Sequence, residues 1–278
     1  MFKVTVVGGA GAMGQWFSKL FMRQGCDVSI CDTDRSAPGI AYELDLTYEE
    51  DVIDAVSNSD IVLISVPMES TEAVIKNISP AMKSGSLLME VASVKGNIPV
   101  VMKQNASVGV DLICANPLFG PNVTDPKGEL IILAPVTEGG EWLQRIRNIF
   151  EDDGLKTELL GFEEHDEVVA VIQGLTHFAF IAIGETLRDL GFDLKGSRRY
   201  MSPFYKAMID SIEGILMQNP ETNARIQMTP ESERVNDIFI SRCNRLAELV
   251  WKRDVDGFSE EMQRAAINLR GKGKVRRD

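Results

Sequence analysis

The stretch KVTVVGGAGAMGQWFSKLF, residues 3–21, joins an apolar strand-like run to an amphipathic helix through a glycine-rich turn. The turn has the pattern Gly-x-Gly-x-x-Gly, formed by Gly9, Gly11 and Gly14. In a strand–turn–helix unit the first glycine permits a tight turn, the second lets a diphosphate approach the backbone, and the third allows the helix to pack closely. The helix N-terminus also offers free N–H groups to the phosphates. This stretch therefore predicts a dinucleotide-binding α/β domain.

The type of nucleotide is predicted from residues that follow the second strand-like run. Asp32 lies 18 residues after Gly14, where a carboxylate can accept hydrogen bonds from both ribose hydroxyls, so we expect NAD. Arg35 leaves NADP open, because a guanidinium at that place can hold a 2′-phosphate. S-adenosylmethionine is a further alternative, since it needs the same carboxylate but no diphosphate site. The expected cofactor-binding residues are Gly9, Gly11, Ala12, Met13, Gly14, Asp32, Ser65, Val66 and Pro67.

Short apolar runs alternate with helical patterns through the first half of the chain. The expected strands are residues 3–7, 27–31, 61–66, 86–91, 111–115 and 130–134. Nearly unbroken apolar strands that alternate with helices are typical of a parallel sheet covered on both faces. From about Glu163 helical periodicity dominates, as in Val168–Leu190 and Pro230–Lys252. The sequence thus predicts an α/β protein with a Rossmann-type, doubly wound parallel sheet in residues 1–162 and an all-helical domain in residues 163–278.

Composition and charge exclude several classes of protein. The chain has 278 residues, with 29 Lys and Arg against 41 Asp and Glu, and a net charge of -12, which argues against a nucleic-acid partner. No apolar run approaches the ~20 residues of a membrane span, and the first residues lack the pattern of a secretory signal. Four cysteines at unrelated spacings and only two histidines predict reduced thiols, no metal site and a cytoplasmic location.

Several segments resemble the prephenate dehydrogenases in order and spacing. They are GGAGAMGQWF (8–17), DIVLISVPMEST (60–71), MEVASVKG (89–96), NPLFGP (116–121), EEHDEVVAVIQGLTHFAF (163–180) and SPFYKAMIDSIEGILMQNPETNARIQM (202–228). The resemblance implies an N-terminal nicotinamide domain, a helical C-terminal domain that forms a homodimer, and an active site between them. It also implies the family's reaction in aromatic amino acid biosynthesis. That reaction is an NAD-dependent oxidative decarboxylation in which a histidine accepts the proton of the ring hydroxyl.

Two positions depart from the family's pattern. Asn116 stands where the family has the histidine of a His-Pro-x-Phe-Gly-Pro motif. Gly214 stands where the family has the arginine of a Gly-Arg-x-x-x-Gln segment, which holds a substrate carboxylate. An amide has no pKa near neutrality and cannot act as a general base. The sequence therefore predicts an altered active site, with a changed substrate or changed chemistry.

Further cleft residues are assigned from the same resemblance. Ser93 and Lys95 match positions beside the nicotinamide and the substrate hydroxyl. The alternatives are a helix cap for Ser93 and a solvated surface charge for Lys95. His177 matches the family's second histidine and is the remaining candidate base. The expected catalytic residues are Ser93, Lys95, Asn116 and His177, and the expected substrate-binding residues are Gln173, Arg198, Arg199 and Lys206.

These observations predict an NAD(P)-dependent oxidoreductase of the prephenate dehydrogenase type that acts on prephenate or a related cyclic or aromatic carboxylate. The alternatives are an S-adenosylmethionine-dependent methyltransferase that reuses the fold on an aromatic substrate, and a non-catalytic ligand sensor. The long helices of the second domain carry more apolar surface than a small cluster can bury alone, which predicts a homodimer through that domain. The basic tail Gly271–Asp278 is expected to be a frayed end.

Overall fold

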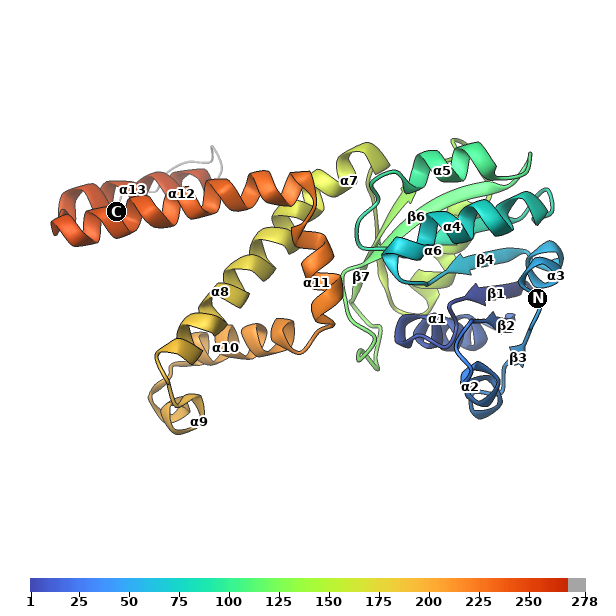
Figure 1. Ribbon diagram of the computed structural model, residues 1–278, viewed down its shortest axis with the longest axis horizontal. Coiled ribbons are helices and arrows are strands. Elements are labelled where there is room, and N and C mark those ends of the chain that lie inside the picture. The colour runs from blue at the N-terminus through green and yellow to red at the C-terminus, as the bar shows by residue number, and fades with distance from the viewer. Residues whose placement is uncertain (270–278) are drawn as a thin grey trace.

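An eight-stranded sheet lies at the centre of the first domain in the computed structural model, which describes residues 1–269 (Figure 1). The strands are β1 (Lys3–Val7), β2 (Asp27–Cys31), β3 (Thr47–Tyr48), β4 (Ile61–Ile64), β5 (Leu87–Glu90), β6 (Asp111–Pro117), β7 (Leu130–Pro135) and β8 (Lys156–Leu159). Their order is β3-β2-β1-β4-β5-β6-β7-β8, which reverses direction between β1 and β4. This order confirms the doubly wound, Rossmann-type class. The tail that is expected to fray lies outside the described residues.

The sequence predicts a parallel sheet. The structure differs at one pair of strands, because β6 and β7 pair antiparallel. Residues 118–129, which join them, contain no helix. A parallel pair needs a long crossover over one face of the sheet, so this connection returns the chain in the opposite direction. The apolar pattern also misses β3 and β8, because β3 has only two residues and most side chains of β8 are exposed.

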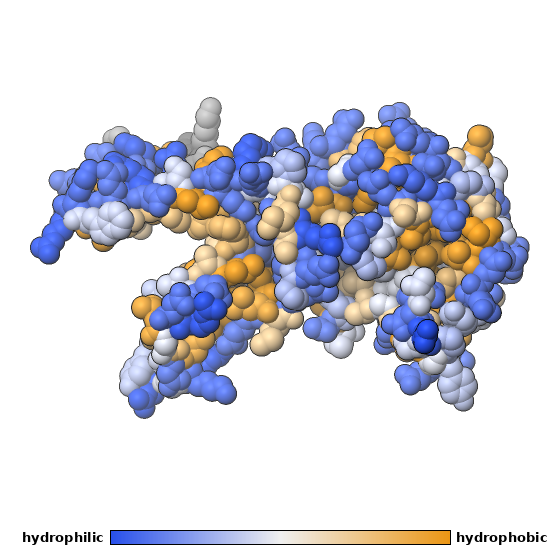
Figure 2. Space-filling view, in the orientation of Figure 1, coloured by the Kyte–Doolittle hydropathy of each residue, from blue (hydrophilic) through white to orange (hydrophobic). Residues whose placement is uncertain are grey.

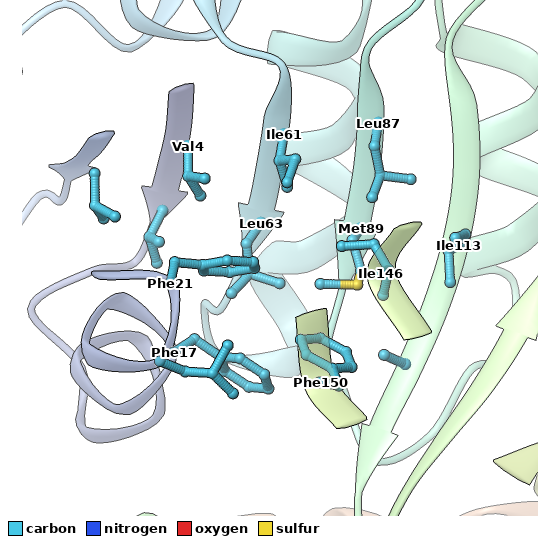
Figure 3. Packing of buried hydrophobic residues seen from close by; sticks show 14 of the residues in the cluster. Val4, Phe17, Phe21, Ile61, Leu63, Leu87, Met89, Ile113, Ile146 and Phe150 are labelled. Atoms are coloured by element: carbon cyan, nitrogen blue, oxygen red, sulfur yellow. The ribbon is translucent and has the colours of Figure 1, made fainter. Parts of the chain in front are cut away.

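Helices cover both faces of the sheet. One face carries α1 (Ala12–Arg23), α2 (Ala37–Glu43) and α6 (Trp142–Asp152), and the other carries α3 (Val52–Asn58), α4 (Met68–Ile78) and α5 (Ile98–Asn105). Figure 3 shows Phe17 and Phe21 of α1 packed with Phe150 of α6 over the strands. All three rings are fully buried, which stabilises the fold by roughly 1.5–3 kcal/mol each. This packing fixes the carboxyl ends of the central strands along one edge.

Only helices follow β8 in the described part of the chain. They are α7 (Phe162–Val169), a π-helical segment (Ala170–Leu175), α8 (Thr176–Asp189), α9 (Leu194–Ser197), a short 3₁₀ helix (Arg198–Tyr200), α10 (Pro203–Leu216), α11 (Pro220–Gln227), α12 (Pro230–Lys252) and α13 (Val255–Leu269). Another short 3₁₀ helix, Ser79–Ala81, follows α4 in the first domain. The bounds of α12 are those that its periodicity predicts. The change from strands to helices falls between Leu159 and Phe162, close to the predicted domain boundary.

One helix differs from the expectation that no segment approaches the length of a membrane span. The continuous helix Phe162–Asp189 is long and apolar enough to cross a membrane, with a mean hydropathy of 1.6 over its most apolar 18 residues. The two criteria differ because Gln173 and His177 interrupt an unbroken apolar run but lower the mean hydropathy of the window only slightly. Length and composition alone are weak evidence for a span, and α8 packs against α10 while the π-helical segment packs against α12.

The helical domain has two arms, one made of α8 to α10 and the other of α12 and α13 (Figure 1). Figure 2 shows apolar residues gathered where the two arms face each other. Exposed large apolar side chains of the arms include Leu190, Phe192, Phe204, Tyr205, Ile238, Ile240, Val250, Trp251, Phe258 and Met262. Soluble monomers rarely leave so much apolar surface in contact with water.

Candidate functional site

A cleft of about 690 Å³ lies between the two domains. One wall consists of the segments that follow β1, β4, β5 and β6, namely residues 11–13, 65–69, 91–93 and 117–122. The other wall consists of the π-helical segment, α8, the end of α10, and α11. Ligands of open α/β sheets bind at this edge, beyond the carboxyl ends of the strands where the strand order reverses. The cleft is therefore the candidate functional site.

The glycine turn between β1 and α1 forms a cradle at one end of the cleft. A Cβ atom on Gly14 would lie 2.2 Å from the carbonyl oxygen of Gly8, so only glycine allows this close packing. Gly11 is exposed to the cleft, and a Cβ there would lie 3.3 Å from the same oxygen. No side chain caps α1 at Gly11, so the N–H groups of its first turn are free for a ligand. These residues fit a diphosphate group.

Asp32 lies beside this turn, at the carboxyl end of β2. Its Oδ2 accepts a hydrogen bond from the Ala10 N–H at 2.9 Å, and its Oδ1 accepts one from the Asp34 N–H at 2.9 Å. Each oxygen can accept another hydrogen bond, which fits the two hydroxyls of a ribose. Of the other expected cofactor-binding residues, Gly11, Ala12, Met13, Ser65, Val66 and Pro67 line the cleft, whereas Gly9 and Gly14 shape the turn behind it.

The structure contradicts both interpretations of Lys95, as a catalytic residue of the cleft and as a solvated surface charge, because Lys95 lies neither in the cleft wall nor on the surface. Its side chain is 1% exposed, and its Nζ donates to Glu90 Oε1 at 2.6 Å, to Ala92 O at 2.7 Å and to Ala115 O at 2.6 Å. An ammonium has three hydrogens, so all of its donors are used inside the protein. The structure therefore makes Lys95 a brace between the ends of β5 and β6 rather than a ligand-contacting residue.

Ser93 and Asn116 differ in their access to the cleft. Ser93 lies in the cleft wall, and it caps no helix, because α5 begins at Ile98 after Asn97. Asn116 is fully buried at the end of β6, and neither its Oδ1 nor its Nδ2 has a hydrogen-bond partner. A buried amide without hydrogen-bond partners destabilises a protein. Asn116 is such an amide, and its neighbour Pro117 lines the cleft.

His177 of α8 lines the cleft, and its Nδ1 lies 2.6 Å from Oδ1 of Asn223 in α11. The amide oxygen only accepts, so Nδ1–H donates and Nε2 keeps its lone pair. Burial lowers the pKa of His177 below its usual value, although the hydrogen bond that it donates to Asn223 acts in the opposite direction. His177 is therefore neutral at pH 7 and able to accept a proton.

The predicted substrate-binding residues separate into two groups. Gln173 lines the cleft, and its buried Oε1 has no partner. Arg198, Arg199 and Lys206 do not line the cleft of their own chain: Arg198 pairs with Asp210 and Glu213, Arg199 stacks on Tyr200, and Lys206 is exposed on α10. The family resemblance places these residues near the cleft, but in the structure they lie before α10 or in its first turn, whereas the opposite end of α10 lines the cleft.

Sequence reasoning missed polar residues that α11 and its flanking turn bring to the cleft. Gln218, Asn223 and Arg225 line it, and Arg225 forms ion pairs with Glu69 and Glu221. The signal that would have found them is the amphipathic pattern of the short helix Pro220–Gln227, whose buried side contains polar Asn223. A buried polar side chain needs a hydrogen-bond partner, and Asn223 finds it in His177 across the cleft wall.

Asp166 of α7 ties the helical domain to the loop after β5. Its carboxylate accepts hydrogen bonds from the Lys95 N–H at 2.9 Å, the Gly96 N–H at 2.7 Å and His165 Nδ1 at 2.7 Å. Burial raises the pKa of Asp166, but these hydrogen bonds outweigh it and hold the pKa below its usual value. These hydrogen bonds attach the helical domain to the domain that contains the sheet.

Two family models match the chain. The model described as prephenate dehydrogenase, nucleotide-binding domain, matches residues 17–159. The model described as prephenate dehydrogenase, dimerization domain, matches residues 162–264. The two matches meet where the strands end and the helices begin.

Similar proteins include two relatives in sequence and one in structure. A Methanocaldococcus jannaschii protein described as "Probable arogenate/prephenate dehydrogenase" is 34% identical over 275 residues, which are 98% of this chain and 62% of that protein. The 4-amino-4-deoxyprephenate dehydrogenase of Streptomyces pristinaespiralis is 25% identical over 264 residues, 92% of this chain and 88% of that one. The chain thus spans about three fifths of the first relative's length.

In structure, the chain is similar to the prephenate dehydrogenase of A. aeolicus, solved with hydroxyphenyl propionate and NAD+. The TM-score is 0.75 at 20% sequence identity, and the match covers 96% of this chain and 97% of the other. The two proteins share a fold.

Proposed function

Because the chain belongs to the prephenate dehydrogenase family, we propose that it is an NAD-dependent dehydrogenase that oxidises and decarboxylates prephenate or a related cyclic carboxylate. The observation that carries this proposal is the cleft, which joins a diphosphate-binding turn to His177, a buried histidine in its neutral form. Asp32 beside the turn favours NAD over NADP. The four unpaired cysteines fit a reducing, cytoplasmic setting.

The methyltransferase alternative and its S-adenosylmethionine cofactor have no support in the comparisons. Both sequence relatives are described as dehydrogenases. The free N–H groups of α1 also suit a diphosphate, which S-adenosylmethionine does not contain. A non-catalytic sensor would need no proton acceptor in the cleft, so His177 favours an enzyme.

Each group in the cleft has a task in the proposed reaction. The N–H groups of α1 bind the diphosphate, and Asp32 accepts hydrogen bonds from the ribose. These residues would hold NAD, which would supply the acceptor for the hydride of the hydroxyl-bearing ring carbon. Nε2 of His177 takes the proton of that hydroxyl, and loss of the ring carboxylate as CO₂ makes the ring aromatic. The Ser93 hydroxyl, in the opposite wall, can hydrogen-bond to the substrate hydroxyl.

The altered positions Asn116 and Gly214 bear on which ring substrate is used. Asn116 lies next to the cleft residue Pro117, and its amide cannot take a proton. Gly214 is exposed on α10 with open space around its Cα, one helical turn before Gln218, which lines the cleft. An arginine at this position has room to reach the cleft. The chain therefore lacks one base and one cation that act on prephenate in the family.

We expect weak prephenate turnover by the unmodified chain. Asn116→His is expected to restore part of kcat, since a general base contributes ~10²–10⁴-fold. Gly214→Arg is expected mainly to lower KM, since a guanidinium binds a carboxylate with two parallel hydrogen bonds. The two effects act on different steps, so they should combine additively in the double variant. Absorbance of reduced NAD measures all four proteins with prephenate and with arogenate.

One outcome of this experiment would contradict the altered site, and another would contradict the dehydrogenase function. Rapid prephenate oxidation by the unmodified chain would remove the case for an altered site and leave an ordinary prephenate dehydrogenase. Absence of NAD reduction with either substrate in all four proteins would remove the dehydrogenase function itself.

Cofactor binding is expected to fail in Gly11→Val. The new side chain fills the diphosphate cradle, and its Cβ would lie 3.3 Å from Gly8 O, so the turn must shift by a few tenths of an ångström while the fold is expected to persist. NAD at a concentration one hundred times its Kd stabilises a protein that binds it by ~2.7 kcal/mol, and this stabilisation is measured as a rise in Tm. This rise should disappear in Gly11→Val and persist in the control Gly39→Ala, where a Cβ meets nothing within 4 Å. An undiminished rise in Gly11→Val would overturn the assignment of the turn.

The proposal includes a homodimer formed by the helical domain. The match to the dimerization domain covers residues 162–264. The apolar side chains exposed on the two arms supply the surface that such an interface buries. In a dimer this surface would also account for the apolar helix Phe162–Asp189, of whose most apolar part only 22% is buried within one chain.

A further inference from the structure

We propose that Arg225 of α11 binds a carboxylate of the substrate, at a place in the cleft distinct from that of Gly214. The inference rests on the proposed function, because it names the group that holds the substrate of that reaction. It identifies the ligand as a small organic anion whose carboxylate lies away from the reacting hydroxyl.

Arg225 is the only lysine or arginine that lines the cleft within residues 1–269. Its Nη2 lies 2.9 Å from Glu221 Oε1, one turn earlier on α11, and 3.1 Å from Glu69 Oε1. Glu69 belongs to the first turn of α4, in the nucleotide-binding domain. The guanidinium therefore spans the cleft between the two domains.

The glutamates paired with Arg225 are exposed enough for a carboxylate of a ligand to take the place of one of them. Its side chain is 36% exposed, and those of Glu69 and Glu221 are 46% and 67% exposed. Exposed ion pairs of this kind contribute little, so a ligand can displace one of them at small cost. A guanidinium presents a planar fork of donors that matches a carboxylate, and such a charge-assisted contact is stronger than a hydrogen bond between neutral groups.

The same short helix also orients the proposed base. Asn223, two positions before Arg225, accepts the hydrogen bond of His177 Nδ1. Both residues line the cleft. Helix α11 thus orients the proton acceptor of α8 and itself carries a carboxylate-binding cation, which fits a substrate with a hydroxyl at one end and a carboxylate at the other.

The test compares two ligands on matched variants in the presence of NAD. The probes are 4-hydroxyphenylpropionate and its uncharged primary amide, and calorimetry measures both dissociation constants. The unmodified chain is expected to bind the carboxylate roughly 10- to 150-fold more tightly than the amide, the range of a charge-assisted contact. Arg225→Gln should bind both alike, and Arg225→Lys should lie between.

The matched control is Arg145→Gln. Arg145 also pairs with a glutamate one turn earlier, Glu141, but lies on α6 outside the cleft. It should keep the full preference for the carboxylate. Glu69→Gln should tighten binding of the carboxylate by about 2- to 5-fold, because the guanidinium loses a competing partner.

Kinetics separate this proposal from the proposed function. Arg225→Gln is expected to raise KM for the ring substrate by a factor similar to that for the probe, with KM for NAD unchanged. If the unmodified chain oxidises no ring substrate but Arg225→Gln still loses the preference for the carboxylate, the dehydrogenase function fails and the anion site stands. An equal preference in the unmodified chain and Arg225→Gln, or no binding of the probe by the unmodified chain, overturns the role of Arg225.

Discussion

His177→Asn is expected to lower kcat by ~10²–10⁴-fold, the range of a lost general base. Asparagine keeps hydrogen-bonding groups at this position but has no proton affinity near neutrality. The structure leaves Nε2 of His177 as the free acceptor, because Nδ1 donates to Asn223. The rate is measured by reduced-NAD absorbance with whichever of prephenate and arogenate the unmodified chain oxidises faster. NAD-induced stabilisation should remain, because His177 lies on the wall opposite the glycine turn.

The pH profile gives an independent test of the same base. Burial lowers the pKa of His177 below 6.5, so the active, neutral form persists at neutral pH and kcat/KM should fall only as the pH drops below about 6.5. Asn223→Asp places a negative charge beside Nδ1–H, which favours the imidazolium and should move this acid limb to higher pH. An unmoved acid limb, or an undiminished kcat in His177→Asn, would show that another group takes the proton.

Lys95→Met is expected to destabilise the protein by ~3–5 kcal/mol, the usual cost of removing one partner of a buried ion pair. Lys95 and Glu90 are 1% and 0% exposed, so the variant leaves a carboxylate without a counter-charge in the interior. It also removes the donor from the carbonyl of Ala115, at the end of β6. Urea unfolding gives the change in free energy, from the midpoint and its slope.

The double variant Glu90→Leu/Lys95→Met separates the charge from the packing. Because both charged groups are absent, most of the lost stability should return, apart from the cost of the backbone groups that Lys95 and Glu90 satisfy. Lys83→Met is the surface control, since Lys83 pairs with a half-buried Asp60 but is itself 42% exposed, and it should cost at most ~1 kcal/mol. A loss below ~1 kcal/mol in Lys95→Met would contradict the buried brace.

The local sequence is sufficient to predict the class of fold and one half of the cleft. The glycine turn after the strand at 3–7 and the carboxylate of Asp32 follow from steric and hydrogen-bonding needs that act within a few residues. The helix Pro230–Lys252 is predicted with its observed bounds, because its proline start and its periodicity are local signals. The cleft position of His177 comes from the family resemblance and agrees with the structure.

Tertiary structure decides which charged side chains face the cleft. The sequence treats Lys95 as a ligand contact or a surface charge, but pairing of β5 with β6 brings Ala115 and Glu90 to its ammonium and buries it. It also places Arg225, rather than Arg198, beside the nucleotide-binding domain, because α11 lines the cleft while Arg198 lies before the start of α10, whose opposite end lines the cleft. The antiparallel β6–β7 pair is decided in the same way. These outcomes depend on contacts between separate elements, such as Lys95 with Ala115 and Arg225 with Glu69, and a local pattern contains no information about which groups the tertiary structure brings together.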